Sequence, residues 1–151
     1  MDGRWCAWAV ATALSLWVLP AQAEIRHIGD YSPSAFSAAS MGGDQAVLVH
    51  AVAKYCPSCD RQRSALQEAM DLVPGASRHM VMVDASMERW GMHPLFAGNA
   101  VDKPGELLLF RGDELLARSR EENLDAMVAL LSTVVEQPGW GPIEVPAIPA
   151  P

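Results

Sequence analysis

Residues 45–59 read QAVLVHAVAKYCPSC, and the fold can be worked out from this stretch. Residues Gln45 to Ala53 form a nearly unbroken apolar and β-branched run. Such a run is typical of a strand buried on both faces, as in a parallel sheet covered by helices. Pro57 suits the first turn of a helix, where a missing N–H costs nothing. The sequence therefore places Cys56 and Cys59 where a buried strand gives way to a helix.

Hydrophobic periodicity predicts further elements on both sides of this turn. Strands are expected at 24–30, 78–84, 106–110 and 114–119, and helices at 33–41, 57–72, 87–90 and 121–135. Arg111-Gly112-Asp113 separates two apolar runs and signals a β-hairpin. Residues 91–104 have no clear period and are interpreted as a long irregular loop. The expected order is a βαβ unit, a further helix, a hairpin and an amphipathic closing helix.

Length and charge bound the class of protein. The chain has 151 residues and a net charge of −7, which indicates one small acidic domain. Binding to nucleic acid or anionic lipid is disfavoured, because phosphate contacts need clustered Lys and Arg. The composition is half apolar, too apolar for disorder, so the fold rests on a hydrophobic core.

The first 23 residues resemble a secretory signal rather than part of the fold. An uncharged run, Trp5 to Leu19, follows Arg4 and precedes Ala21-Gln22-Ala23. The run is shorter than the ~18 residues expected of a membrane-spanning helix, so cleavage after Ala23 is expected, with a retained anchor as the alternative. We expect a periplasmic protein with a domain at 24–136 and an extended Pro-rich tail at 137–151.

Two cysteines remain after such cleavage, and their position gives them a chemistry. A thiolate at a helix N-terminus faces free backbone N–H groups and the positive end of the helix dipole, which lowers the pKa of a thiol. Cys56 is therefore the expected attacking sulfur. Cys59 lies one turn later, where it can attack a mixed disulfide and release the substrate.

Other uses of the cysteine pair fit less well. Zinc needs four ligands, and no second C-x-x-C is present, although His50, His79 and His93 could join the cysteines. Haem attachment needs a histidine after the pair, where Asp60 stands. A purely structural disulfide across so short a loop would remove little chain entropy. Methionines that could bind copper occur in two clusters, Met80 with Met82 and Met87 with Met92. Met80 and Met82, however, lie on one face of a predicted strand and are expected in the core.

On these residues the chain resembles the thioredoxin-like thiol-disulfide oxidoreductases, and more closely their exported bacterial members. The resemblance covers residues 45–135 and is carried by the strand AVLVHAVAKY before CPSC, by VMVDA, by LLLFRGDELLARS and by the last helix. It implies a three-layer α/β/α fold with a central mixed sheet and the dithiol at one edge. It also implies a reversible disulfide cycle that needs no bound cofactor or metal.

The resemblance assigns supporting roles around the dithiol. Tyr55 keeps the aromatic residue of the family motif, whereas Pro57-Ser58 between the cysteines is closer to the CPxC of glutaredoxin-like and DsbA-like proteins. His50 stands six positions before Cys56, where thioredoxins have a buried acid. It is expected either to accept a proton from Cys59, to favour a thiolate as a cation, or to be a core histidine bonded to backbone.

The family also places a cis-proline opposite the dithiol. Pro104, shortly before the 106–110 strand, is the expected residue, and Pro94 is the rival. A cis peptide there would lay the backbone beside the sulfurs and offer an edge for substrate main chain. The alternative for each proline is an ordinary trans turn.

The expected function is thiol-disulfide exchange with protein substrates by a monomer that binds neither nucleic acid nor, after cleavage, membrane. Family analogy favours a reductase that serves one periplasmic partner and is recharged by a redox partner not yet identified. One alternative is a non-catalytic thioredoxin-like binding module or a copper or other metal chaperone. Another is a DsbA-like oxidant, although such proteins carry a helical insertion for which this chain has no room.

Overall fold

The structure is a computed structural model that describes residues 24–140. In chain order its strands are β1 (Arg26–Asp30), β2 (Ala46–Val52), β3 (Met80–Ser86), β4 (Glu106–Arg111) and β5 (Glu114–Ser119). Its α-helices are α1 (Pro33–Ser40), α2 (Pro57–Leu72), α3 (Met87–Trp90), α4 (Pro94–Ala97) and α5 (Leu124–Glu136), and short 3-10 turns, η1 and η2, lie at Met41–Gly43 and Ala76–Arg78. The expected signal segment lies outside the described residues.

The strands form one mixed sheet in the order β1-β3-β2-β4-β5. β1, β3 and β2 run parallel, and β4 and β5 are antiparallel to their neighbours. β2 lies at the centre, and six of its seven residues are buried. This arrangement confirms that the apolar run at 45–53 is a strand covered on both faces.

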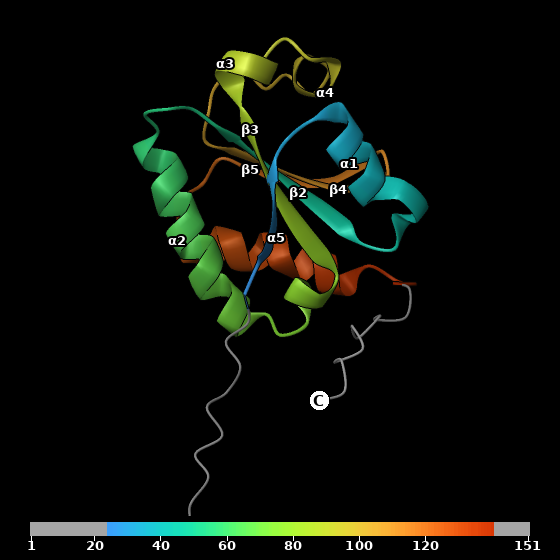
Figure 1. Cartoon of the computed structure of the whole chain (residues 1–151). Coiled ribbons are helices and arrows are strands. Elements are labelled where there is room, and N and C mark those ends of the chain that lie inside the picture. The colour runs from blue at the N-terminus through green and yellow to red at the C-terminus, as the bar shows by residue number, and fades with distance from the viewer. Residues whose placement is uncertain (1–23, 141–151) are drawn as a thin grey trace, which may run out of the picture.

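Helices cover both faces of the sheet, with α2 and α5 on one side and α1 on the other (Figure 1). Alternate residues of the strands belong to two separate cores. Leu48, Met82 and Leu109 face α2 and α5, whereas Val49, Val83 and Leu108 face α1 and the segment that carries α3 and α4. The sheet is therefore the middle of three layers, as the resemblance implied. Met80 and Met82 are both buried in the core, as their spacing in the strand predicts.

The long irregular loop expected at 91–104 contains a helix, so that prediction was wrong in part. α4 begins at Pro94, and the side chain of His93 caps it by accepting a hydrogen bond from the Leu95 N–H at 3.2 Å. Phe96 in this helix is fully buried. A single turn is too short to show a period, so only its contact with the core reveals it.

The start of the expected extended tail is packed against the domain. Trp140 donates its indole N–H to the Val134 carbonyl at 2.9 Å and stacks on His79, with ring centroids 5.4 Å apart. The Arg111 guanidinium lies 4.4 Å from the centre of the same ring. The expectation of an unpacked tail is therefore wrong for residues 137–140, and residues 141–151 lie outside the described part of the chain.

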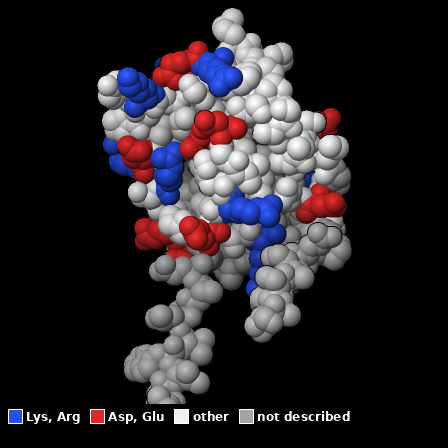
Figure 2. All heavy atoms as spheres, viewed as in Figure 1, with Lys and Arg blue, Asp and Glu red and all other residues white. Residues whose placement is uncertain are grey.

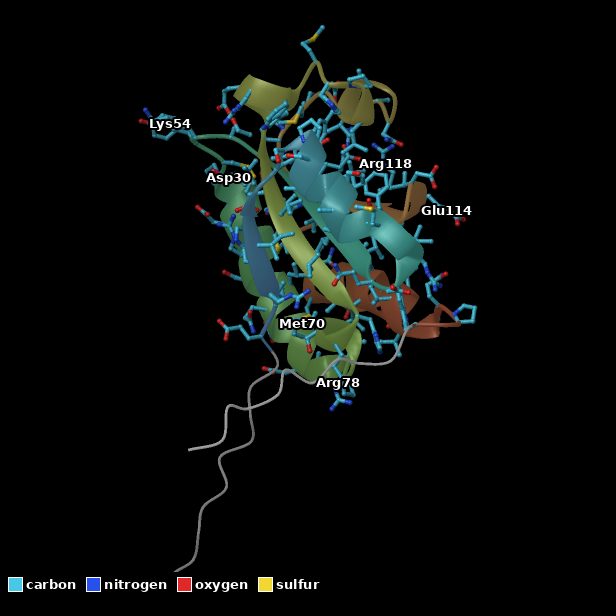
Figure 3. All side chains as sticks on the ribbon, turned by 45° about the vertical axis from the view of Figure 1, so that its right-hand side comes forward. Asp30, Lys54, Met70, Arg78, Glu114 and Arg118 are labelled. Carbon is cyan, nitrogen blue, oxygen red and sulfur yellow. A yellow bond between two sulfur atoms is a disulfide. The ribbon has the colours of Figure 1, made fainter. Side chains whose placement is uncertain are left out.

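The dithiol turn lies at one end of the sheet. Lys54, which precedes it, and Arg78, which precedes β3, lie at opposite ends of the molecule (Figure 3). On the face drawn in Figure 2, basic and acidic side chains are interspersed rather than gathered by sign. Within residues 24–140, none of the helices is both long enough and apolar enough to cross a bilayer.

Candidate active site

Cys56 and Cys59 lie at the turn from β2 into α2, as the sequence predicts. Cys56 is the N-cap of α2, and Pro57 occupies its first turn. The two cysteines are joined by a disulfide, with Cα atoms 5.2 Å apart. Cys59 is only 3% exposed, whereas Cys56 is partly exposed. A sulfur that approaches from solvent therefore reaches Cys56 first.

Hydrogen-bond donors gather around the Cys56 sulfur. The Cys59 backbone N–H donates to Cys56 Sγ at 3.2 Å, and the Ser58 hydroxyl lies 3.3 Å from the same atom. These donors and the N-terminus of α2 stabilise negative charge on Cys56 more than on Cys59. Cys59 Sγ lies instead 3.7 Å from the carbonyl oxygen of Ala51, which attracts no anion. The geometry thus supports an attacking role for Cys56 and a resolving role for Cys59.

The segment before β4 lies against the other side of the dithiol turn. The Gly105 N–H donates to the Ala51 carbonyl at 2.7 Å. A Cβ on Gly105 would lie 2.8 Å from Ser58 Oγ, and the φ of Gly105 is +85°, so the backbone conformation and the close approach both favour glycine there. Pro104, one residue earlier, is exposed on the rim of this contact.

The expected cis-proline is absent from the described residues. Residues 24–140 contain no cis peptide bond, so the predictions for Pro104 and for its rival Pro94 are both wrong. The chain instead turns into β4 through the left-handed conformation of Gly105. Pro94 serves as the first residue of α4, a position that suits a trans proline.

The residues that precede Cys56 are exposed and anchored to α3. The Tyr55 side chain is 85% exposed beside the dithiol, so it is available for contact with a partner rather than buried. The Lys54 N–H donates to Glu88 Oε1 at 3.1 Å. Hydrogen bonds from the Ser86 hydroxyl and from backbone N–H groups, including that of Lys54, lower the pKa of Glu88, which keeps this acceptor ionised.

A surface hollow takes its lining from α3 and the residues after it. It has a volume of about 540 Å³ and lies between α3 and residues 97–102, with Met87, Met92 and Val101 among its lining residues. Met87 in its lining precedes Glu88, the residue that accepts a hydrogen bond from Lys54. Met92 is 93% exposed there, so the hollow has an exposed apolar residue at its edge.

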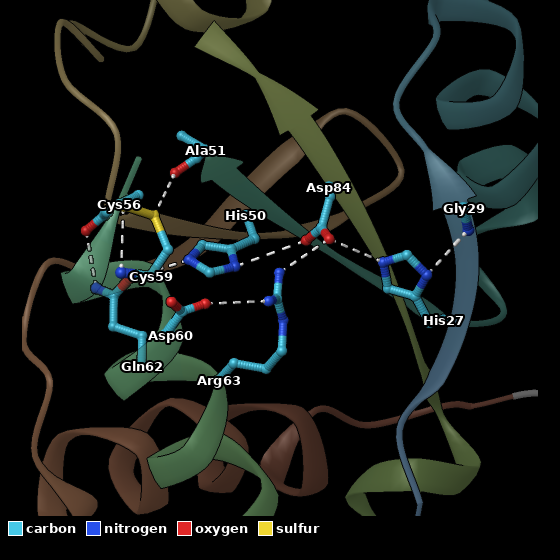
Figure 4. A network of polar contacts seen from close by, with 11 residues as sticks. His27, Gly29, His50, Ala51, Cys56, Cys59, Asp60, Gln62, Arg63 and Asp84 are labelled. Atoms are coloured by element: carbon cyan, nitrogen blue, oxygen red, sulfur yellow. Dashed lines mark hydrogen bonds and ion pairs between the residues drawn. A yellow bond between two sulfur atoms is a disulfide. The ribbon is translucent and has the colours of Figure 1, made fainter. Parts of the chain in front are cut away.

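His50 is fully buried in β2 and belongs to a polar network beneath the dithiol (Figure 4). Its Nε2 lies 3.0 Å from Oε1 of Gln62, which is one helical turn beyond Cys59. Its Nδ1 lies 3.6 Å from Oδ1 of Asp84 in β3. The expectation of a core histidine bonded only to backbone is therefore wrong, because both nitrogens face side chains.

Asp84 joins this network to the surface. Arg63 donates to its Oδ2 at 3.0 Å, and His27 Nε2 lies 3.2 Å from the same atom. Burial tends to raise the pKa of Asp84, but the interaction with His50 and the charge of Arg63 outweigh it, and the pKa lies below its usual value. Sequence reasoning missed both Gln62 and Asp84. A polar residue on the buried face of the 57–72 helix, and an acid at the end of an apolar strand, were the available signals.

A second cluster holds the segment before β4 in place. Glu106, only 1% exposed, is paired with Arg118 and Arg120 of the neighbouring strand and its extension. Arg118 also donates to the Asn99 carbonyl at 2.9 Å, which ties residues 97–102 to β5. Among residues 24–140, no group of three or more His, Cys, Asp or Glu is arranged to hold a metal ion.

Solved structures similar to this one include thioredoxins. Trxlp from Edwardsiella tarda is 26% identical, with a TM-score of 0.58 over 68% of this chain and 96% of that one. Thioredoxin from Malassezia sympodialis is 13% identical, with a TM-score of 0.56 over 73% and 92% of the two chains. A mutant thioredoxin from Halobacterium salinarum is 14% identical, with a TM-score of 0.55 over 74% and 93%. No family model matches the chain, and no curated protein matches it in sequence.

The chain thus has a thioredoxin-like α/β fold. This fold and the Cys56–Cys59 pair at disulfide distance support a redox function, in general terms that of a thiol-disulfide oxidoreductase.

Proposed function

We propose that this protein is an exported thiol-disulfide oxidoreductase that exchanges disulfides with protein substrates through Cys56 and Cys59. The observation that carries the proposal is the unequal exposure of the two sulfurs: Cys56 is partly exposed at the N-terminus of α2, and Cys59 is 3% exposed behind it. One sulfur can therefore react with a partner while the other is held ready to resolve the intermediate.

In the reducing direction, the Cys56 thiolate attacks one sulfur of a substrate disulfide. The bond between Cys56 and that sulfur forms, the substrate S–S bond breaks, and the other substrate sulfur leaves as a thiolate. Cys59, as a thiolate, then attacks Cys56, closes the Cys56–Cys59 disulfide and releases the first substrate sulfur. Two electrons pass to the substrate, and an external dithiol must reduce the protein again. The same steps run backwards when the protein acts as an oxidant.

Protein substrates are favoured by the surroundings of Cys56. Exposed Tyr55 offers contact area beyond the sulfur itself. We propose that the protein acts in the periplasm as a monomer and reduces one particular partner. Support for export comes from the segment 1–23, and support for the reducing direction comes from family analogy.

Single cysteine variants test the exchange reaction. Cys59→Ser removes the resolving sulfur, so mixed disulfides through Cys56 should accumulate when the variant is incubated with a disulfide-bonded protein or with periplasmic extract. They should appear on non-reducing gels as dithiothreitol-sensitive adducts. Cys56→Ser is the matched control and should trap nothing, because Cys59 is buried. If neither variant forms adducts and the wild type does not cycle against glutathione, the proposal is wrong.

The reduction potential decides the direction. Titration of the Cys56–Cys59 pair against glutathione or dithiothreitol should give a value near or below about −230 mV for a reductase. A value above about −180 mV would make the protein an oxidant instead. A metal-binding module would behave differently from both, since either cysteine substitution would abolish metal binding and neither would trap an adduct.

A further inference from the structure

The protonation of His50 can be derived from the hydrogen bonds of its neighbour Gln62. The Gln62 amide nitrogen donates to the carbonyl oxygens of Gly105, at 2.8 Å, and Glu121, at 3.2 Å. Carbonyl oxygens only accept, so the NH₂ group of Gln62 must lie on that side. Its Oε1 therefore faces His50 Nε2, 3.0 Å away, and can only accept. It follows that Nε2 of His50 carries a proton.

The other ring nitrogen of His50 faces an acid. Nδ1 lies 3.6 Å from Asp84 Oδ1, just beyond hydrogen-bond distance, and both atoms are buried without another hydrogen-bond partner. Asp84 is ionised, because Arg63 donates to its Oδ2 and its pKa lies below the usual range; burial opposes that shift, and His50 and Arg63 outweigh it. A neutral His50 would point a lone pair at a carboxylate, leaving two buried acceptors unsatisfied. A second proton, on Nδ1, turns this contact into an ion pair between an imidazolium and a carboxylate.

We propose that His50 is held as an imidazolium by Asp84 and Gln62, and that this buried cation acts as a positioning charge that stabilises a thiolate at the dithiol. The ring lies between Cys59 and Asp84 (Figure 4). Two features connect the His50 ring to Cys59. Cys59 Sγ lies 3.7 Å from the carbonyl oxygen of Ala51, the residue after His50. Gln62, which contacts the ring, follows Cys59 by one helical turn. This inference deepens the proposed function and depends on it.

Among the described residues, Asp84 is the only acid paired with the His50 ring. From β1, His27 reaches Asp84 rather than the His50 ring, and from β4 the register partner of His50 is apolar Leu107. From α2, the charged neighbours are Arg63, a cation bound to Asp84, and the exposed Asp60, whose carboxylate lies 3.6 Å from Arg63. The residues before α5 reach the network through the backbone carbonyl of Glu121. Glu106, at the start of β4, is neutralised by Arg118 and Arg120.

The consequence for the redox reaction is a stabilised reduced form. Reduction of the disulfide takes up two electrons and one proton and gives a thiolate at Cys56 and a thiol at Cys59, while a substrate dithiol becomes a disulfide and releases two protons. Only the reduced form carries the negative charge, so a nearby cation favours it over the disulfide. Compared with a neutral residue at position 50, His50 therefore makes the Cys56–Cys59 disulfide more oxidising.

Nitrogen NMR of the full chain tests the protonation directly. In the wild-type protein at pH 7 both His50 nitrogens should show the equal, protonated shifts of an imidazolium, with the signal assigned by its loss in His50→Gln. In Asp84→Asn, the new amide can donate to Nδ1, so we expect the split shifts of a neutral ring protonated on Nε2. Split shifts in the wild type would overturn the inference.

The reduction potential and the thiolate titration test the electrostatic effect. His50→Gln should weaken oxidation of reduced glutathione about tenfold, equivalent to about 30 mV in a two-electron couple, and should move the 240 nm thiolate absorbance to higher pH. His79→Gln removes a histidine that stacks on Trp140, away from the site, and should leave both unchanged. An unchanged potential in His50→Gln would contradict the inference while leaving Cys59→Ser trapping intact. Absence of trapping would instead contradict the proposed function.

Discussion

Gly105 faces the dithiol turn from the β4 side and illustrates how one residue shapes the site. Its φ of +85° and the 2.8 Å approach of a built Cβ to Ser58 Oγ both disfavour a side chain. We expect Gly105→Ala to cost about 1–2 kcal/mol for the left-handed backbone alone, and more because Ser58 must move. Urea unfolding of the oxidised protein measures the loss.

The contribution of the close approach can be separated from that of the backbone. Gly112→Ala has the same kind of backbone conformation, with φ +62°, but its Cβ would meet nothing within 4 Å. Gly105→Ala should therefore be the less stable of the two, and adding Ser58→Ala to it should recover part of the difference. Equal stability of the two glycine variants would show that Ser58 does not restrict this position.

At the scale of elements, the short helices beside the dithiol depend on tertiary contacts. α3 and α4 have four residues each, too few to be stable alone. Tyr31, 2% exposed, packs its ring against Trp90 of α3 and Phe96 of α4, each with centroids 5.4 Å away. Tyr31→Ala should lower the free energy of unfolding by about 3–5 kcal/mol and accelerate amide exchange in these helices more than in α2.

Tyr31→Phe is the control for this prediction. It keeps the ring and removes only the hydroxyl, which lies 3.4 Å from His93 Nδ1, so it should cost about 1 kcal/mol. Amide exchange that rises equally in α2, α3 and α4 for Tyr31→Ala would argue against a local anchoring role.

For the whole molecule, the ionisation of Asp84 makes the free energy of unfolding depend on pH. Its folded-state pKa is lowered by His50 and Arg63 against the opposing effect of burial, and it lies below the unfolded value of about 3.9. Its contribution is therefore fully present above that value and lost as pH falls through the folded pKa. Asp84→Asn should destabilise the protein most near pH 7, and the difference from wild type should shrink below about pH 4.

Thermal unfolding between pH 3 and 7 measures this effect, with Asp71→Asn as the control at an exposed position of α2. The control should show no such pH-dependent difference. If Asp84→Asn were equally destabilising at pH 3 and pH 7, the ion pairs of Asp84 would not be the source of its stability.

Short-range patterns in the sequence were enough to predict most of the framework. The apolar run ending before Lys54, the proline after Cys56 and the Gly112 turn predicted β2, α2 and the β4–β5 hairpin, because burial of a strand and the geometry of a turn depend on neighbouring residues. The thiol chemistry was predicted for the same reason, since a helix N-terminus and a C-x-x-C spacing are both local.

Contacts across the fold decided what surrounds the dithiol. His50 meets Gln62, 12 residues away, and Gln62 meets Gly105, 43 residues away, only because β2, α2 and the start of β4 pack together. The same packing buries Phe96 in a helix that has no periodic signal, and turns the chain at Gly105 without a cis-proline. The local pattern determined where the cysteines lie and that a helix follows them, because a strand, a turn and a helix N-terminus depend on neighbouring residues. Packing between distant segments determined which polar side chains surround His50 beneath them.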